Sequence, residues 1–178
     1  MKRILLLTIF LTCLVSLTYS QSRVRPNTPY SVLNSNPGFV SINEVTAGSG
    51  LGGTTRPYTK SFIGFTTVVG YKLTSNFTAG VGTGLSFYDA GLLVPLFLDF
   101  RYTFMDRQLT PYLWADGGMM INTSDFGETK LFLNPGAGAR YSFSRWIAVN
   151  GGVGIITQVD GKARASFLNF KIGGVYVF

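Results

Sequence analysis

The sequence is poor in charged residues and contains no histidine. Only 13% of its 178 residues are Asp, Glu, Lys or Arg, whereas a typical soluble domain has about 25%. The single cysteine, Cys13, lies in an apolar N-terminal stretch. Once that stretch is removed, disulfides, thiolate nucleophiles and Cys/His zinc sites are excluded. Hydrolases that need a histidine base are excluded as well.

Long apolar runs are also missing beyond the N-terminus. The chain is 46% apolar and 15% aromatic, a composition that argues against a disordered protein. Yet after residue 20 no segment approaches the ~18 consecutive apolar residues of a transmembrane helix. The apolar residues must therefore be distributed in another pattern.

The first 20 residues have the pattern of a secretory signal peptide. Lys2 and Arg3 precede an apolar core from Ile4 to Leu17, and small residues surround the expected cleavage point after Ser20. Residues 21–38 contain three prolines and are predicted to form an extended periplasmic lead-in. Without the signal peptide the net charge is +5, and the positive residues are scattered, so we expect no nucleic-acid partner.

The remaining chain alternates with a period of two residues. From Leu92 to Phe104 every second residue is apolar, and the residues between them include Asp99 and Arg101. This pattern is typical of a strand that separates two environments. It recurs over residues 39–48, 63–71, 77–87, 111–121, 131–143, 146–157 and 168–178. The first of these is irregular, because Glu44 shares a face with Val40 and Ile42, and we expect a bulge or a rim position for Glu44.

Eight strands of about ten residues predict an all-β fold, an eight-stranded antiparallel up-and-down transmembrane barrel over residues 39–178. Closure is required because lipid cannot satisfy an open sheet edge. Short connections (74–76, 105–110, 144–145) alternate with longer ones (49–60, 122–130, 158–166). Both termini then lie on the short-turn, periplasmic side. Aromatic residues near strand ends on that side predict a headgroup-level girdle: Tyr71, Phe77, Tyr102, Phe104, Tyr112, Phe143, Trp146, Tyr176 and Phe178.

The inward face of the predicted barrel carries a nearly balanced set of charges. By parity this set is Glu44, Asp99, Arg101, Asp116, Arg140 and Lys171. Eight strands enclose only enough volume for side chains, so we expect an ionic network that plugs the lumen. Asp99 and Asp116 could instead form a catalytic carboxylate pair. Ion-pair partnership is the simpler interpretation, because structural ion pairs often resemble sites.

The last strand ends on alternating apolar residues and a terminal aromatic: Phe170, Ile172, Tyr176 and Phe178, with Gly174 departing from the pattern. In this respect the chain, over Phe39 to Phe178, resembles the small eight-stranded outer-membrane barrels of the OmpA/OmpX kind. The resemblance implies that these four residues form the signal read by the barrel-assembly machinery. It also implies an outer-membrane location after signal-peptide cleavage. Enzymes on similar barrels need a catalytic histidine, so we expect neither enzymatic activity nor a cofactor or metal.

Three functions are compatible with these observations. The first is a non-enzymatic barrel with a structural or interaction role in the bacterial envelope, such as membrane integrity or accessory binding to a larger envelope complex. The second is a narrow pore, and the third is a secreted lipocalin-like carrier with reversed alternation. Basic loop residues could contact anionic lipopolysaccharide or could simply be solvated: Arg56, Lys60, Lys130, Lys162 and Arg164.

Overall fold

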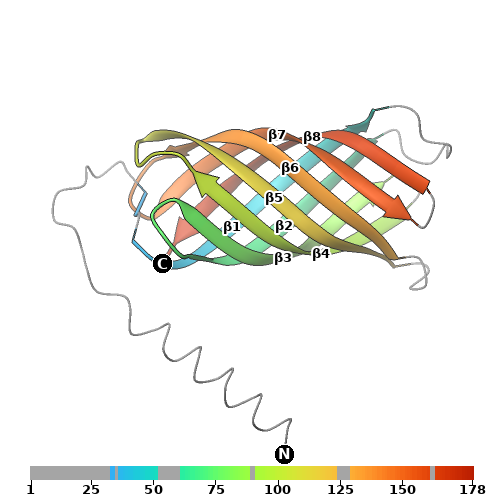
Figure 1. Ribbon diagram of the computed structural model, residues 1–178, viewed down its shortest axis with the longest axis horizontal. Coiled ribbons are helices and arrows are strands. Elements are labelled where there is room, and N and C mark those ends of the chain that lie inside the picture. Colours follow the sequence, from blue (N-terminus) through green and yellow to red (C-terminus); the bar gives the residue numbers. More distant parts are fainter. Residues whose placement is uncertain (1–32, 35, 52–60, 89–90, 124–128, 161–162) are drawn as a thin grey trace, which may run out of the picture.

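The computed structural model describes residues 33–34, 36–51, 61–88, 91–123, 129–160 and 163–178, and their regular secondary structure is entirely β-strand. The strands are β1 (Gly38–Gly50), β2 (Ser61–Lys72), β3 (Phe77–Tyr88), β4 (Gly91–Thr103), β5 (Leu109–Asn122), β6 (Thr129–Ser142), β7 (Ile147–Asp160) and β8 (Ala163–Val177). Each pairs antiparallel with the next, and β8 pairs with β1, which closes the sheet (Figure 1). The predicted eight-stranded antiparallel barrel is confirmed. Within the described ranges, none of the structure is a helix long and apolar enough to span a membrane.

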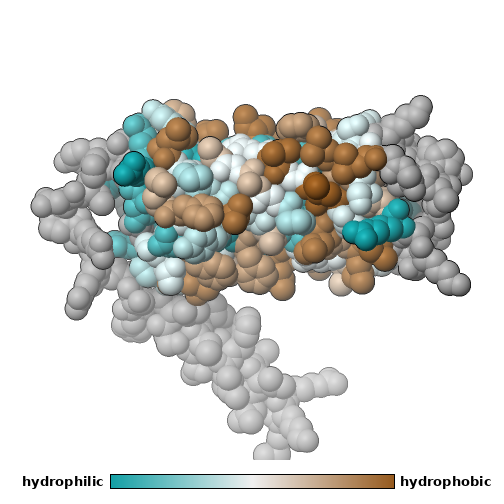
Figure 2. Space-filling model, turned by 45° about the horizontal axis from the view of Figure 1, so that its top comes forward, coloured by the Kyte–Doolittle hydropathy of each residue, from teal (hydrophilic) through white to brown (hydrophobic). Residues whose placement is uncertain are grey.

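Side chains alternate between an exposed outer face and a buried inner face along each strand. In β4, Leu98 and Phe100 are 52% and 43% exposed, whereas Asp99 between them is 0% exposed. Apolar side chains cover much of the outer wall (Figure 2). A soluble barrel would bury these residues and expose the charged ones. The period-two pattern of the sequence is therefore confirmed, with apolar residues outside.

The two ends of the barrel differ in their connections. Residues 73–76, 104–108 and 143–146 connect strands at the end that also holds the C-terminus (Figure 1), and we call this the short-turn end. At the opposite, long-loop end, β1 ends at Gly50 and β2 begins at Ser61, and β5 ends at Asn122 and β6 begins at Thr129. The expected long connection over 158–166 is wrong, because β7 continues to Asp160 and β8 begins at Ala163. The predicted signal peptide (1–20) and most of the lead-in lie outside the described residues.

Strand β1 is regular, and the expected bulge or rim position for Glu44 is wrong. Its pairing with β2 is continuous from Gly38 to Ser49, and Glu44 lies opposite Thr66. Glu44 is 1% exposed and faces the lumen together with Val40 and Ile42. The inward face of β1 is mixed because its apolar residues, Val40 and Ile42, lie near the short-turn end and Glu44 lies further along the strand.

Two prolines interrupt the sheet without opening it. Opposite Pro95 of β4, residues 84–85 of β3 are unpaired in the ladder. Opposite Pro135 of β6, residues 155–156 of β7 are likewise unpaired. Proline has no N–H to donate, so each ladder lacks two residue pairs and then resumes in the same register.

Candidate functional site

The lumen is layered along the barrel axis. On β1, Val40 and Ile42 precede Glu44 from the short-turn end, and on β4, Leu93 and Phe97 precede Asp99 from the long-loop end. All six side chains are buried. On these two strands the carboxylates therefore lie in the middle of the lumen, with apolar side chains on both sides. The apolar layer at the long-loop end contains edge-to-face and stacked rings: Phe62, Tyr88, Phe97, Phe132 and Phe167.

Arg101 of β4 is the centre of the ionic network. Its Nη1 and Nη2 atoms donate to the two carboxylate oxygens of Glu44 at 2.8 and 2.9 Å. Its Nε and Nη2 atoms donate to Asp99 at 2.8–3.0 Å. All three side chains are at most 1% exposed. Two carboxylates thus share one guanidinium, whose planar fork suits bidentate pairing.

Lys171 of β8 extends the network to the opposite wall. Its ammonium donates to Asp116 of β5 and, at 3.4 Å, to Glu44. The Asn134 amide donates to the same Asp116 oxygen, Oδ2, at 2.9 Å. The Asn150 amide donates to Glu44 Oε1 at 2.6 Å. Five of the six predicted charged residues are therefore joined through ion pairs that connect β1, β4, β5 and β8.

Arg140 of β6 faces the lumen but does not join these ion pairs. Among the described residues it forms no salt bridge, and its Nε atom has no hydrogen-bond partner. Its guanidinium instead lies over the ring of Tyr112, with Cζ 5.6 Å from the ring centroid. The expectation that Arg140 belongs to the ionic network is wrong, because Arg140 lies nearer the short-turn end than Asp99 or Asp116.

The prediction that Tyr112 belongs to the outer aromatic girdle is also wrong, because Tyr112 faces the lumen. It is 1% exposed, and its hydroxyl accepts a hydrogen bond from the Asn150 amide at 3.3 Å. The neighbouring inward residue, Trp114, packs where β6 and β7 carry glycines, and a Cβ at Gly136, Gly152 or Gly154 would meet its indole ring. The glycines of the lumen wall therefore make room for large side chains from β5.

Sequence reasoning assigned no role to several polar residues of the lumen: Lys72, Asn134, Asn150, Gln158 and Asn169. Asn134 and Asn169 occupy inward positions in the alternation of their strands, so the sequence carries a signal for these two residues. Asn150 lies in a strand whose alternation is weakened by Gly151, Gly152 and Gly154. Lys72 follows Tyr71 at the end of β2, where a charged residue could equally have been solvated.

Two residues that precede β1, Leu33 and Asn34, contact the short-turn end of the barrel. Leu33 is buried in the apolar cluster of the lumen. The Asn34 N–H donates to the Arg145 carbonyl at 2.8 Å, and its own carbonyl accepts from Lys72 Nζ at 3.0 Å. These contacts hold the end of the lead-in across the mouth of the barrel.

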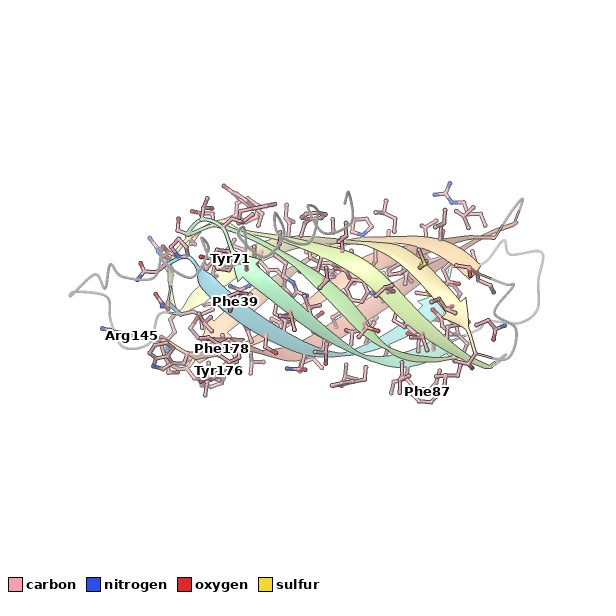
Figure 3. All side chains as sticks on the ribbon, turned by 90° about the horizontal axis from the view of Figure 1, so that it is seen from below. Phe39, Tyr71, Phe87, Arg145, Tyr176 and Phe178 are labelled. Atoms are coloured by element: carbon pink, nitrogen blue, oxygen red, sulfur yellow. The ribbon has the colours of Figure 1, made fainter. Side chains whose placement is uncertain are left out.

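The outer surface at this end carries rings. Phe39, Tyr71, Tyr176 and Phe178 lie together there, whereas Phe87 lies at the other end (Figure 3). Phe39 packs edge-on to Tyr71, and Tyr176 packs edge-on to Phe178, at centroid distances of 5.2 and 4.9 Å. The four residues of the predicted assembly signal, Phe170, Ile172, Tyr176 and Phe178, all face outward.

The chemistry of the lumen is that of an ion-pair network. Asp99 and Asp116 face each other across β4 and β5, and each is bonded to a different cation. Within the network three carboxylates share two cations, Arg101 and Lys171. Among the described residues no group of three or more His, Cys, Asp or Glu side chains could hold a metal ion.

Comparison with known proteins identifies the fold. No protein-family model matches the chain, and no curated protein is similar to it in sequence. Its structure is similar to that of the Neisserial surface protein A, with a TM-score of 0.56 and 15% identity, covering 79% of this chain and 97% of that one. It is also similar to the outer membrane protein OprG from Pseudomonas aeruginosa, with a TM-score of 0.54 and 11% identity, covering 84% and 99% of the two chains. The chain therefore has the fold of the small eight-stranded outer-membrane barrels.

Proposed function

We propose that this protein is a non-enzymatic β-barrel of the bacterial outer membrane, with a structural or interaction role in the envelope. The observation that carries the proposal is the sorting of side chains: bulky apolar residues cover the outer wall, and the network charges are buried in the lumen. Such a wall is stable in hydrocarbon, where an arginine or lysine would cost about 2–4 kcal/mol. The closed sheet leaves no edge that lipid would have to satisfy.

Cell fractionation tests this location. We expect the protein to resist carbonate extraction, to remain in the outer-membrane fraction and to migrate differently on gels before and after heating. Release into the soluble fraction would reject the proposal. A lipocalin-like carrier, the alternative with apolar residues inside, is disfavoured by exposed residues such as Ile63 and Leu133 on the outer wall.

The lumen is proposed to be closed rather than conducting. Three features support closure: the ion pairs around Arg101, the ring layer at the long-loop end, and Leu33 at the short-turn end. In planar bilayers we expect the purified protein to show no sustained open channels. Sustained channels would favour the narrow pore instead, and removal of the Leu33 side chain (Leu33→Ala) would then be expected to raise their conductance.

The absence of enzymatic activity is proposed on the same geometry. Each of the three lumen carboxylates is bonded to a cation, and the chain has no histidine to act as a base. A carboxylate held in this way is a poor proton acceptor for a substrate. Protein-only incubation with lipid and peptide substrates is expected to give no product.

The partners are proposed to be outer-membrane lipid, lipopolysaccharide and, during biogenesis, the barrel-assembly machinery. Of the basic loop residues, Lys130 and Arg164 are described and lie on β6 and β8 near the long-loop end. Arg56, Lys60 and Lys162 lie outside the described residues. Crosslinking in native envelopes followed by pull-down would test for a larger complex, and recovery of the barrel alone would argue against an accessory role.

A further inference from the structure

A small cavity lies inside the barrel between the ionic network and the ring layer. Its volume is about 30 Å³. One side of its wall is polar and includes Asp116, Asn134 and Asn169, and the other side includes Phe97 and Phe132. The cavity therefore lies where the charged and the apolar layers of the lumen meet.

The polar wall contains hydrogen-bonding atoms that no described residue satisfies. Asp116 Oδ1, Asn134 Oδ1 and both amide atoms of Asn169 are buried without a partner, and so is Thr66 Oγ1. The two asparagines and the aspartate are at most 3% exposed. A buried polar atom without a partner costs about 1–3 kcal/mol. Five such atoms around one cavity indicate a small polar ligand.

The local sequence keeps this space open. Gly154 of β7 lies directly opposite Asn169 of β8, and a Cβ at Gly154 would lie 2.8 Å from Asn169 Oδ1. Any other residue there would push the amide of Asn169 from its position. A glycine on one strand therefore allows the amide on the next to face the cavity.

The donor and acceptor set favours water over a cation. Asn169 presents an N–H donor as well as a carbonyl acceptor. A cation cannot accept a hydrogen bond from that donor, whereas water both donates and accepts. We propose that the cavity is a binding site for ordered water that bridges Asp116, Asn134 and Asn169. Since one water needs roughly 10–15 Å³ of such volume, there is room for about two molecules.

This water links the ionic network to the ring layer. The Oδ2 atom of Asp116 is bonded to Lys171 and Asn134, and bound water would satisfy its second oxygen, Oδ1. The inference concerns the lumen interior alone and holds whether or not the barrel conducts ions. Channels seen in a bilayer experiment would therefore reject the closed lumen and leave the water site untouched. Absence of the water from a crystal structure would likewise leave the closed lumen untouched.

Crystal structures of the full chain, grown in sodium and in rubidium salts, test the proposal. We expect the same density peaks in both, at hydrogen-bond distance from Asp116 Oδ1 and from the Asn169 amide. An anomalous rubidium peak in the cavity would overturn the proposal in favour of a cation. Direct hydrogen bonds among Asp116, Asn134 and Asn169, with no density between them, would overturn it as well.

A pair of variants sharpens this test. In Asn169→Leu the peak bonded to residue 169 is expected to be lost. In Gln158→Leu, which removes another buried lumen amide outside the cavity wall, all peaks are expected to remain. Unchanged density in Asn169→Leu would contradict the proposed ligand set. If Asn169→Leu does not fold, the unsubstituted crystals decide alone.

Discussion

Replacement of Arg101 by methionine is the sharpest test of the ionic network. Arg101 makes five N–H to oxygen contacts of 2.8–3.0 Å, two with Glu44 and three with Asp99. After the substitution Glu44 keeps Lys171 at 3.4 Å, but Asp99 keeps no cation among the ion pairs of the described residues. Removing one partner of a buried ion pair costs about 3–5 kcal/mol. We expect Arg101→Met to lower the free energy of unfolding by that amount.

The assay is equilibrium unfolding in urea from lipid vesicles, followed by tryptophan fluorescence. Trp114 is buried in the lumen and reports on its opening. Addition of Glu44→Gln to Arg101→Met removes one charge of each sign, so the two changes should be non-additive by about 1–3 kcal/mol. Arg107→Met, at an exposed turn, is the matched control and should change stability by less than about 0.5 kcal/mol. A loss below about 1 kcal/mol for Arg101→Met, or additivity in the cycle, would refute the reasoning.

Three further outcomes are expected. In a double-mutant cycle, the stability losses of Asp116→Asn and Arg140→Gln should add within about 0.5 kcal/mol, because the two positions are separated by roughly 20 Å along the strands. A coupling energy above about 1 kcal/mol would contradict this separation. Gly136→Ala should destabilise the barrel by about 1–3 kcal/mol in urea unfolding, because the added methyl group overlaps the indole ring beside it. Gly174→Ala, whose added methyl group meets no atom within 4 Å, should be nearly neutral. Equal losses of stability in the two variants would be inconsistent with this packing. Leu98→Arg on the outer wall should cost about 2–4 kcal/mol in vesicles, and an unchanged stability there would argue against contact with lipid.

Much of the fold could be predicted because a strand has a fixed period of two. Once alternate residues of β4 are apolar, Asp99 and Arg101 must share the opposite face. The same rule fails locally where side chains are small or the lumen itself is apolar. Glycines weaken the alternation of β7, so the inward position of Asn150 could not be predicted. Val40 and Ile42 are apolar and share a face with Glu44, so the sequence suggested a bulge where the strand is regular. Tyr112 was assigned to the wrong face because an aromatic residue near a strand end can lie either in the outer girdle or in the lumen.

The sequence by itself determined the number of strands, the closure of the sheet and the face on which most side chains lie, since each depends on local periodicity and on length. Only the tertiary structure decided which inward residues meet. Lys171 and Glu44 are 127 residues apart, and they come into contact because the staggered register of the closed barrel brings them to the same height. Arg140 shares their face, but that stagger places it nearer the short-turn end, beside Tyr112. Parity assigns a side chain to the lumen, whereas the stagger of the strands assigns its height along the axis and so its partner.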